Sequence, residues 1–151
     1  MNTLRAWLLG SLLALLASPV LADLELQLQT EGLEPAQQRA SQALLDEALQ
    51  ALPPSFKARL DRRIQVNWSA KMPEDAYGQA SLVSTLELNS QLLPSLTDGS
   101  AATSKTGRAH GTVRQELLAT VLHELTHIYD RARLWQGRER QLIIQCTRHV
   151  S

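Results

Sequence analysis

Apolar and polar residues alternate in three stretches of the chain, and a period of two is typical of half-buried β-strands. In residues 23–29, leucine occupies every second position and Asp, Glu or Gln the others. In residues 63–69, Ile, Val and Trp occupy one face and polar residues the other. A weaker alternation of leucine and polar residues covers 80–89. We therefore predict three strands.

A spacing of three to four residues between apolar positions predicts helices elsewhere. Alanine and leucine recur in this way from Pro35 to about Leu52, and the following Pro53-Pro54 ends the helix. A short helix is expected over residues 55–61. Residues 71–78, which contain proline and glycine, are expected to form a loop.

The longest predicted helix covers residues 113–134. Thr112 and Gln115 fit a capping box at its start. One face is apolar and the other polar. The apolar face holds Val113, Leu117, Leu118, Val121, Leu122, Leu125 and Ile128, and the polar stripe holds Glu116, Thr120, His123, His127 and Asp130.

Two segments before this helix carry weaker signals. Asn89-Ser90 is expected to cap a short helical turn that continues to Leu96. Residues 97–111 are rich in Gly, Ser, Thr and Ala and have almost no large apolar side chain. Such a composition buries little surface, so we expect a mobile loop. The loop is a plain linker or a flap over a substrate cleft, and His110 lies at its end.

The order strand, helix, strand, strand, helix predicts an α+β fold. We expect a small twisted sheet of about three strands packed against helices, with the helix of residues 113–134 as its longest element.

The first 22 residues have the pattern of a signal peptide. Arg5 precedes an apolar run, and Val20-Leu21-Ala22 fits a cleavage site. We expect one domain over residues 23–151, exported to the periplasm or secreted, with no stable membrane anchor after cleavage. This part holds 14 basic and 15 acidic residues, so charge gives no case for nucleic acid. The single Cys146 cannot form an internal disulfide, and the sequence does not indicate the oligomeric state.

The sequence His123-Glu124-Leu125-Thr126-His127 is an H-E-x-x-H motif on the long helix. The two histidines are one turn apart on one face, so both imidazoles can reach the same metal ion. Glu124 points about 100° round the helix, where a base can take a proton from a water molecule that the metal activates. Zn²⁺ suits neutral imidazole ligands. The alternative is two surface histidines on an amphipathic helix.

A catalytic zinc site normally has three protein ligands, and the motif supplies two. Glu139 is our candidate for the third ligand, with Asp130 and His149 as alternatives. Asp130 is better suited to orient a ligand histidine from outside the metal's own coordination. Glu139 can also form a surface ion pair with a neighbouring arginine, and Asp130 can be an ordinary solvated carboxylate.

The form His-Glu-Leu-Thr-His resembles the motif of thermolysin-like zinc metallopeptidases, the gluzincin branch of the zincins. The resemblance implies that His123 and His127 bind zinc, that Glu124 is the general base, and that the domain is a zincin-like N-terminal subdomain. It also implies an edge strand beside the motif helix that holds an extended peptide, for which residues 80–89 are our candidate. Those enzymes take a third ligand from a Glu-x-x-x-Asp motif about twenty residues on, and this chain has none in that place.

The run of residues 127–135, His-Ile-Tyr-Asp-Arg-Ala-Arg-Leu-Trp, also looks like a group of larger bacterial periplasmic zincin-like proteins. In these proteins an acidic segment follows later, so we expect a chain that is short or truncated at its C-terminus.

Two functions follow from the sequence. The first is a periplasmic or secreted zinc metallopeptidase that acts on a peptide or protein substrate. The second is a non-catalytic or truncated zincin-like domain that acts as a binding module. In the first, Tyr77 or Tyr129 can donate a hydrogen bond to the oxyanion that forms during hydrolysis; core packing is the other role for both.

Overall fold

The computed structural model describes residues 24–60, 63–81, 84–103 and 109–136. The predicted signal peptide, Glu139, Cys146 and His149 lie outside these residues. The elements, in chain order, are β1 (Glu25–Leu28), α1 (Pro35–Ala51), α2 (Pro54–Lys57), β2 (Arg63–Ser69), β3 (Gly78–Ala80), β4 (Thr85–Asn89), η1 (Ser90–Leu92), α3 (Leu93–Asp98), β5 (Ala101–Thr103), β6 (Ala109–Thr112) and α4 (Val113–Gln136). No helix within the described ranges is long and apolar enough to span a membrane.

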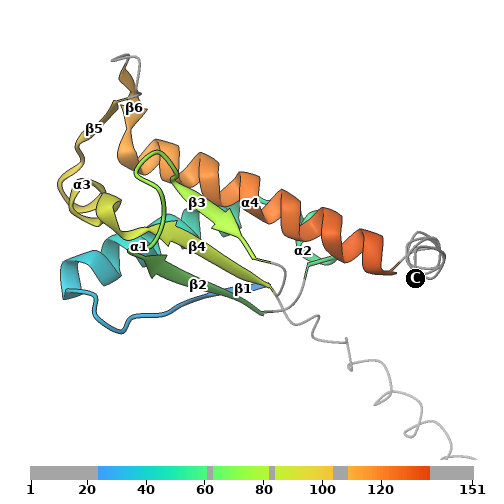
Figure 1. The fold of residues 1–151 in the computed structure, drawn as a ribbon. Coiled ribbons are helices and arrows are strands. Elements are labelled where there is room, and N and C mark those ends of the chain that lie inside the picture. The colour runs from blue at the N-terminus through green and yellow to red at the C-terminus, as the bar shows by residue number, and fades with distance from the viewer. Residues whose placement is uncertain (1–23, 61–62, 82–83, 104–108, 137–151) are drawn as a thin grey trace, which may run out of the picture.

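A four-stranded mixed sheet forms the centre of the fold, with the strand order β1-β2-β4-β3 (Figure 1). β1, β2 and β4 run parallel, and β3 pairs antiparallel with β4 at one edge. Helix α1 connects β1 to β2, as a parallel pair requires a crossover. The α+β class is confirmed, with one strand more in this sheet than we expected.

The alternation in β2 decides which side of the sheet is covered. Ile64 and Val66 are fully buried, whereas Arg63 and Gln65 are exposed. The buried side packs against α1 and α4, which also pack against each other. Trp68 adds a polar tie, because its ring N–H donates to the hydroxyl of the buried Ser41 on α1 at 3.1 Å. The apolar faces that the sequence predicted therefore meet in one core.

The single strand that we predicted over residues 80–89 is wrong. The chain forms two antiparallel strands instead, β3 and β4, and the turn between them brings Ser81 N–H to the carbonyl oxygen of Thr85 at 2.8 Å. Ser84 takes a positive φ of 37°, which reverses the chain. Few residues other than glycine, asparagine and aspartate adopt this conformation, so a single serine is only a weak turn signal in the sequence.

The loop that we predicted over residues 97–111 is also wrong for its described part. α3 continues to Asp98 and ends at Gly99, whose φ is 74°. β5 and β6 then pair antiparallel as a separate two-stranded sheet, so the described parts of this segment are strands rather than loop. Both strands contact α4.

Candidate metal centre

Helix α4 places the site through its two unlike faces. The predicted capping box starts it: Thr112 Oγ1 accepts from Gln115 N–H at 3.2 Å, and Gln115 Oε1 accepts from Thr112 N–H at 2.9 Å. The apolar face is buried in the core through Val113, Leu117, Val121, Leu125 and Ile128. The side chains of the polar stripe are half-buried or exposed. The edge strand β3 lies alongside α4 (Figure 1).

His123, Glu124 and His127 come together as the sequence predicted. One ligand atom from each residue lies within 4.8 Å of the others, and no other group of this kind occurs within the described ranges. The Nε2 atoms of His123 and His127 are 3.0 Å apart, and the two rings are perpendicular. Two imidazole nitrogens on one tetrahedral zinc ion are about 3.3 Å apart, given Zn–N bonds of about 2.05 Å. Both imidazoles therefore fit a zinc ion with little movement.

Glu124 is held by the sheet rather than by the histidines. Its Oε2 accepts a hydrogen bond from the main-chain N–H of Ala80 in β3 at 2.7 Å. The side chain is half-buried, whereas His123 and His127 are exposed. The carboxylate is thus fixed in direction and keeps further lone pairs for a second partner.

Arg131, about two turns after Glu124 on α4, also bonds to the Ala80 end of β3. Its Nη1 donates to the main-chain oxygens of Ala80, at 3.2 Å, and Ser81, at 2.6 Å. Both main-chain groups of Ala80 therefore bond to α4. The edge strand beside the helix is β3, not the whole of residues 80–89, and a peptide cannot pair with Ala80 unless Glu124 and Arg131 give up these bonds.

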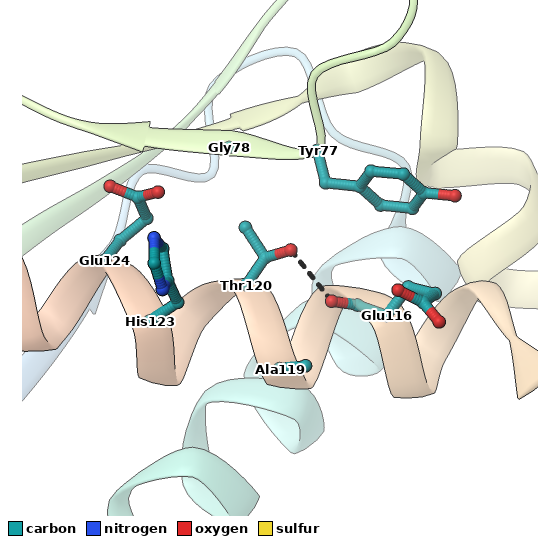
Figure 2. A pocket seen from close by; sticks show the side chains of 7 residues that line it. All are labelled: Tyr77, Gly78, Glu116, Ala119, Thr120, His123 and Glu124. Atoms are coloured by element: carbon teal, nitrogen blue, oxygen red, sulfur yellow. Dashed lines mark hydrogen bonds between the residues drawn. The ribbon is translucent and has the colours of Figure 1, made fainter. Parts of the chain in front are cut away.

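A close contact brings β3 down onto α4. A Cβ atom added to Gly78 would lie 2.9 Å from Thr120 Cγ2 and 3.0 Å from the main-chain oxygen of Glu87. Only glycine lets the strand approach this closely. An open pocket of about 430 Å³ lies along this contact (Figure 2), lined by Tyr77, Gly78, Glu116, Ala119, Thr120, His123 and Glu124.

The remaining sequence candidates divide between pocket and core. Tyr77 lines the pocket. Tyr129 does not: its ring stacks on Phe56 with centroids 4.5 Å apart, and its hydroxyl accepts from Arg59 at 3.1 Å. Asp130 is exposed and is not part of the His–Glu–His group. Glu139, our candidate third ligand, lies outside the described residues, as does the side chain of His110.

Four residues of the site had no role in our sequence analysis. Ala80 acts through its main chain, which no side-chain pattern can reveal. Arg131 is a basic residue near the end of the long helix, where a positive charge suits the helix dipole, so it gave no signal for a site. Gly78 belonged to a predicted loop. Glu116 lay on the predicted polar stripe, two turns before His123, so its spacing was the one available signal.

Comparison with known proteins places the chain in a family. A family model described as Domain of unknown function (DUF7844) matches residues 25–151, and the chain belongs to this family. No curated protein and no solved structure matches the chain.

Proposed function

We propose that this member of the DUF7844 family is a zinc-dependent metallopeptidase of the zincin type, exported to the periplasm or secreted. The observation that supports it is the geometry of one helical turn, where two imidazole nitrogens lie 3.0 Å apart with a carboxylate beside them. The edge strand β3 along α4 also agrees with a zincin-like N-terminal subdomain.

His123 and His127 would hold the metal through Nε2. Zinc in such a site lowers the pKa of a water molecule towards neutrality and polarises the carbonyl of the peptide bond. Glu124 would take a proton from that water at Oε1, because Oε2 is bonded to Ala80 N–H. The same oxygen then delivers the proton to the leaving amine. Glu139 remains our candidate for the third ligand.

A second function has one observation in its favour. In a non-catalytic zincin-like binding module, the bond between Glu124 and Ala80 would be a purely structural link between helix and sheet. The two functions differ in what Glu124→Gln does. A glutamine Oε1 can still accept from Ala80 N–H, so the fold is retained, but an amide cannot act as a base.

The metal is tested first, by measuring zinc per chain with elemental mass spectrometry after dialysis against metal-free buffer. We expect about one zinc per chain in the wild-type protein and none in His123→Ala, since one imidazole alone is a weak site. Equal zinc content in the two proteins would remove His123 from the site.

Hydrolysis is then tested with fluorescently labelled casein and the zinc-loaded protein. We expect Glu124→Gln to lower the rate about 100- to 10,000-fold, the contribution usual for a general base. Glu31→Gln, which changes an exposed carboxylate in the turn before α1, is the matched control and keeps the wild-type rate. If wild-type protein holds zinc but cleaves no better than Glu124→Gln, the binding module is the correct function.

A further inference from the structure

The pocket extends well beyond the atoms that the proposed chemistry uses. It begins at His123 and Glu124 and runs towards the start of α4, where Tyr77 and Glu116 line its far end (Figure 2). Glu116 lies seven positions before His123, which corresponds to about 10 Å along a helix. This length suits a side chain of the substrate rather than the bond that is cleaved.

The Glu116 carboxylate is the only charged group at the far end of the described pocket. No hydrogen bond or ion pair engages it within the described ranges, although Arg114, two positions earlier, pairs with Glu47 at 2.5 Å. Glu116 is half-buried, so its charge is less well solvated than that of an exposed residue. A negative charge in the first turn interacts favourably with the helix dipole, but that interaction does not explain why the carboxylate lines a pocket.

The wall between Glu116 and the candidate metal centre is mostly apolar. Thr120 turns its hydroxyl to the helix, where it donates to the main-chain oxygen of Glu116 at 2.8 Å, and its methyl group towards β3 (Figure 2). Ala119 and the ring of Tyr77 supply further carbon surface. An open, mostly apolar pocket that ends at a carboxylate and an aromatic ring matches a long side chain with a cationic head.

We propose that this pocket binds the lysine or arginine side chain of a residue close to the cleaved bond, with Glu116 as the specificity-determining residue. The inference rests on the proposed function for the position of the cleaved bond, but not for the binding of the cation. An extended lysine or arginine side chain covers most of this distance from a substrate backbone that lies near His123.

Binding is measured first, by fluorescence anisotropy with zinc-loaded Glu124→Gln protein so that no cleavage interferes. The probes are blocked alanine pentapeptides with one central lysine, arginine, norleucine or glutamate. We expect lysine and arginine to bind about tenfold more tightly than norleucine, as for one charge-assisted hydrogen bond. A free-amine alanine pentapeptide tests whether an N-terminal ammonium is the ligand instead; tighter binding of that peptide than of the lysine peptide would overturn the assignment to a side chain.

Two variants then test Glu116. Glu116→Gln keeps the shape of the side chain and is expected to remove the preference for lysine over norleucine. Glu116→Lys is expected to favour the glutamate peptide. Glu31→Gln is the control and keeps the wild-type preference. Equal binding of lysine and norleucine peptides, or a lysine preference that survives Glu116→Gln, would overturn the inference.

Failure of this inference and failure of the proposed function give different results. Mass spectrometry locates the bonds that are cleaved in casein. Cleavage that does not depend on a neighbouring lysine or arginine would support the peptidase but contradict the cation pocket. A lysine preference in binding that depends on Glu116, with no cleavage by wild-type protein, leaves the pocket standing and removes hydrolysis.

Discussion

The two faces of α4 carry different tasks. On one face Leu117, Val121 and Leu125 are fully buried in the core. On the other, His123 and His127 are exposed, and Glu116 and Glu124 are half-buried along an open pocket. Residues next to each other in the sequence therefore have different roles. Those on the buried face pack in the core and hold α4 in position, and those on the open face form the candidate metal centre.

The difference teaches how a small domain can hold a reactive group in place. The rings of His123 and His127 contact one another, and both side chains are exposed, so the helix backbone sets the spacing between them. Glu124 lies at the border of the two faces and is tied to β3 through Ala80. Packing of the helix thus positions the two proposed ligands, whereas a hydrogen bond positions the proposed base.

Leu125→Ala gives the largest expected loss of stability. The side chain is fully buried in the main cluster, so its removal leaves a cavity and lowers the free energy of unfolding by about 2–5 kcal/mol. Urea denaturation measures it. His123→Ala, two residues away on the open face, is the control and changes this free energy by about 0.5 kcal/mol or less without metal. Similar losses in both variants would mean that the two faces are not separate in function.

Arg131→Ala tests the link between helix and sheet. It removes two bonds from a charged donor to main-chain oxygens of β3, so we expect a loss of about 1–3 kcal/mol and faster hydrogen exchange at Ala80 N–H. Arg133→Ala is the matched control, because Arg133 is exposed and no hydrogen bond or ion pair engages it within the described part of the chain. Unchanged exchange at Ala80 would show that Glu124 alone holds the strand.

Thr112→Ala has the smallest expected effect, because it removes one half of the capping box at the start of α4. We expect a loss of about 1 kcal/mol from urea denaturation, while Thr112→Ser, which keeps an acceptor oxygen, stays near the wild-type value. The cap lies about three turns before His123, so zinc retention should be unaffected by either change. Loss of zinc in Thr112→Ala but not in Thr112→Ser would show that the geometry of the candidate metal centre depends on the cap.

The elements with regular patterns were predictable from the sequence. β2 occupies residues 63–69 as the alternation predicted, and α1 ends before Pro53-Pro54. The H-E-x-x-H motif brought His123, Glu124 and His127 together because they lie within little more than one helical turn. These features depend on neighbours in sequence, which is what a periodic pattern records.

The features that were missed depend on contacts distant in sequence. Ser84 takes a positive φ, for which serine is only a weak signal. β5 and β6 pair although alanine and glycine favour strands weakly. The closeness of Gly78 to Thr120 and the bond from Ala80 to Glu124 arise only once β3 lies on α4. No local pattern in the sequence contains that information.

The hydrogen bond between Ala80 and Glu124 has a consequence for how such an enzyme would lose activity. The two proposed histidine ligands keep their spacing as long as this stretch of α4 is intact, whereas Glu124 needs the sheet as well. Separation of α4 from β3 would leave a protein that keeps its metal but has misplaced its base. In mild denaturant, inactivation would then precede metal release, and zinc content alone would overstate how much active enzyme remains.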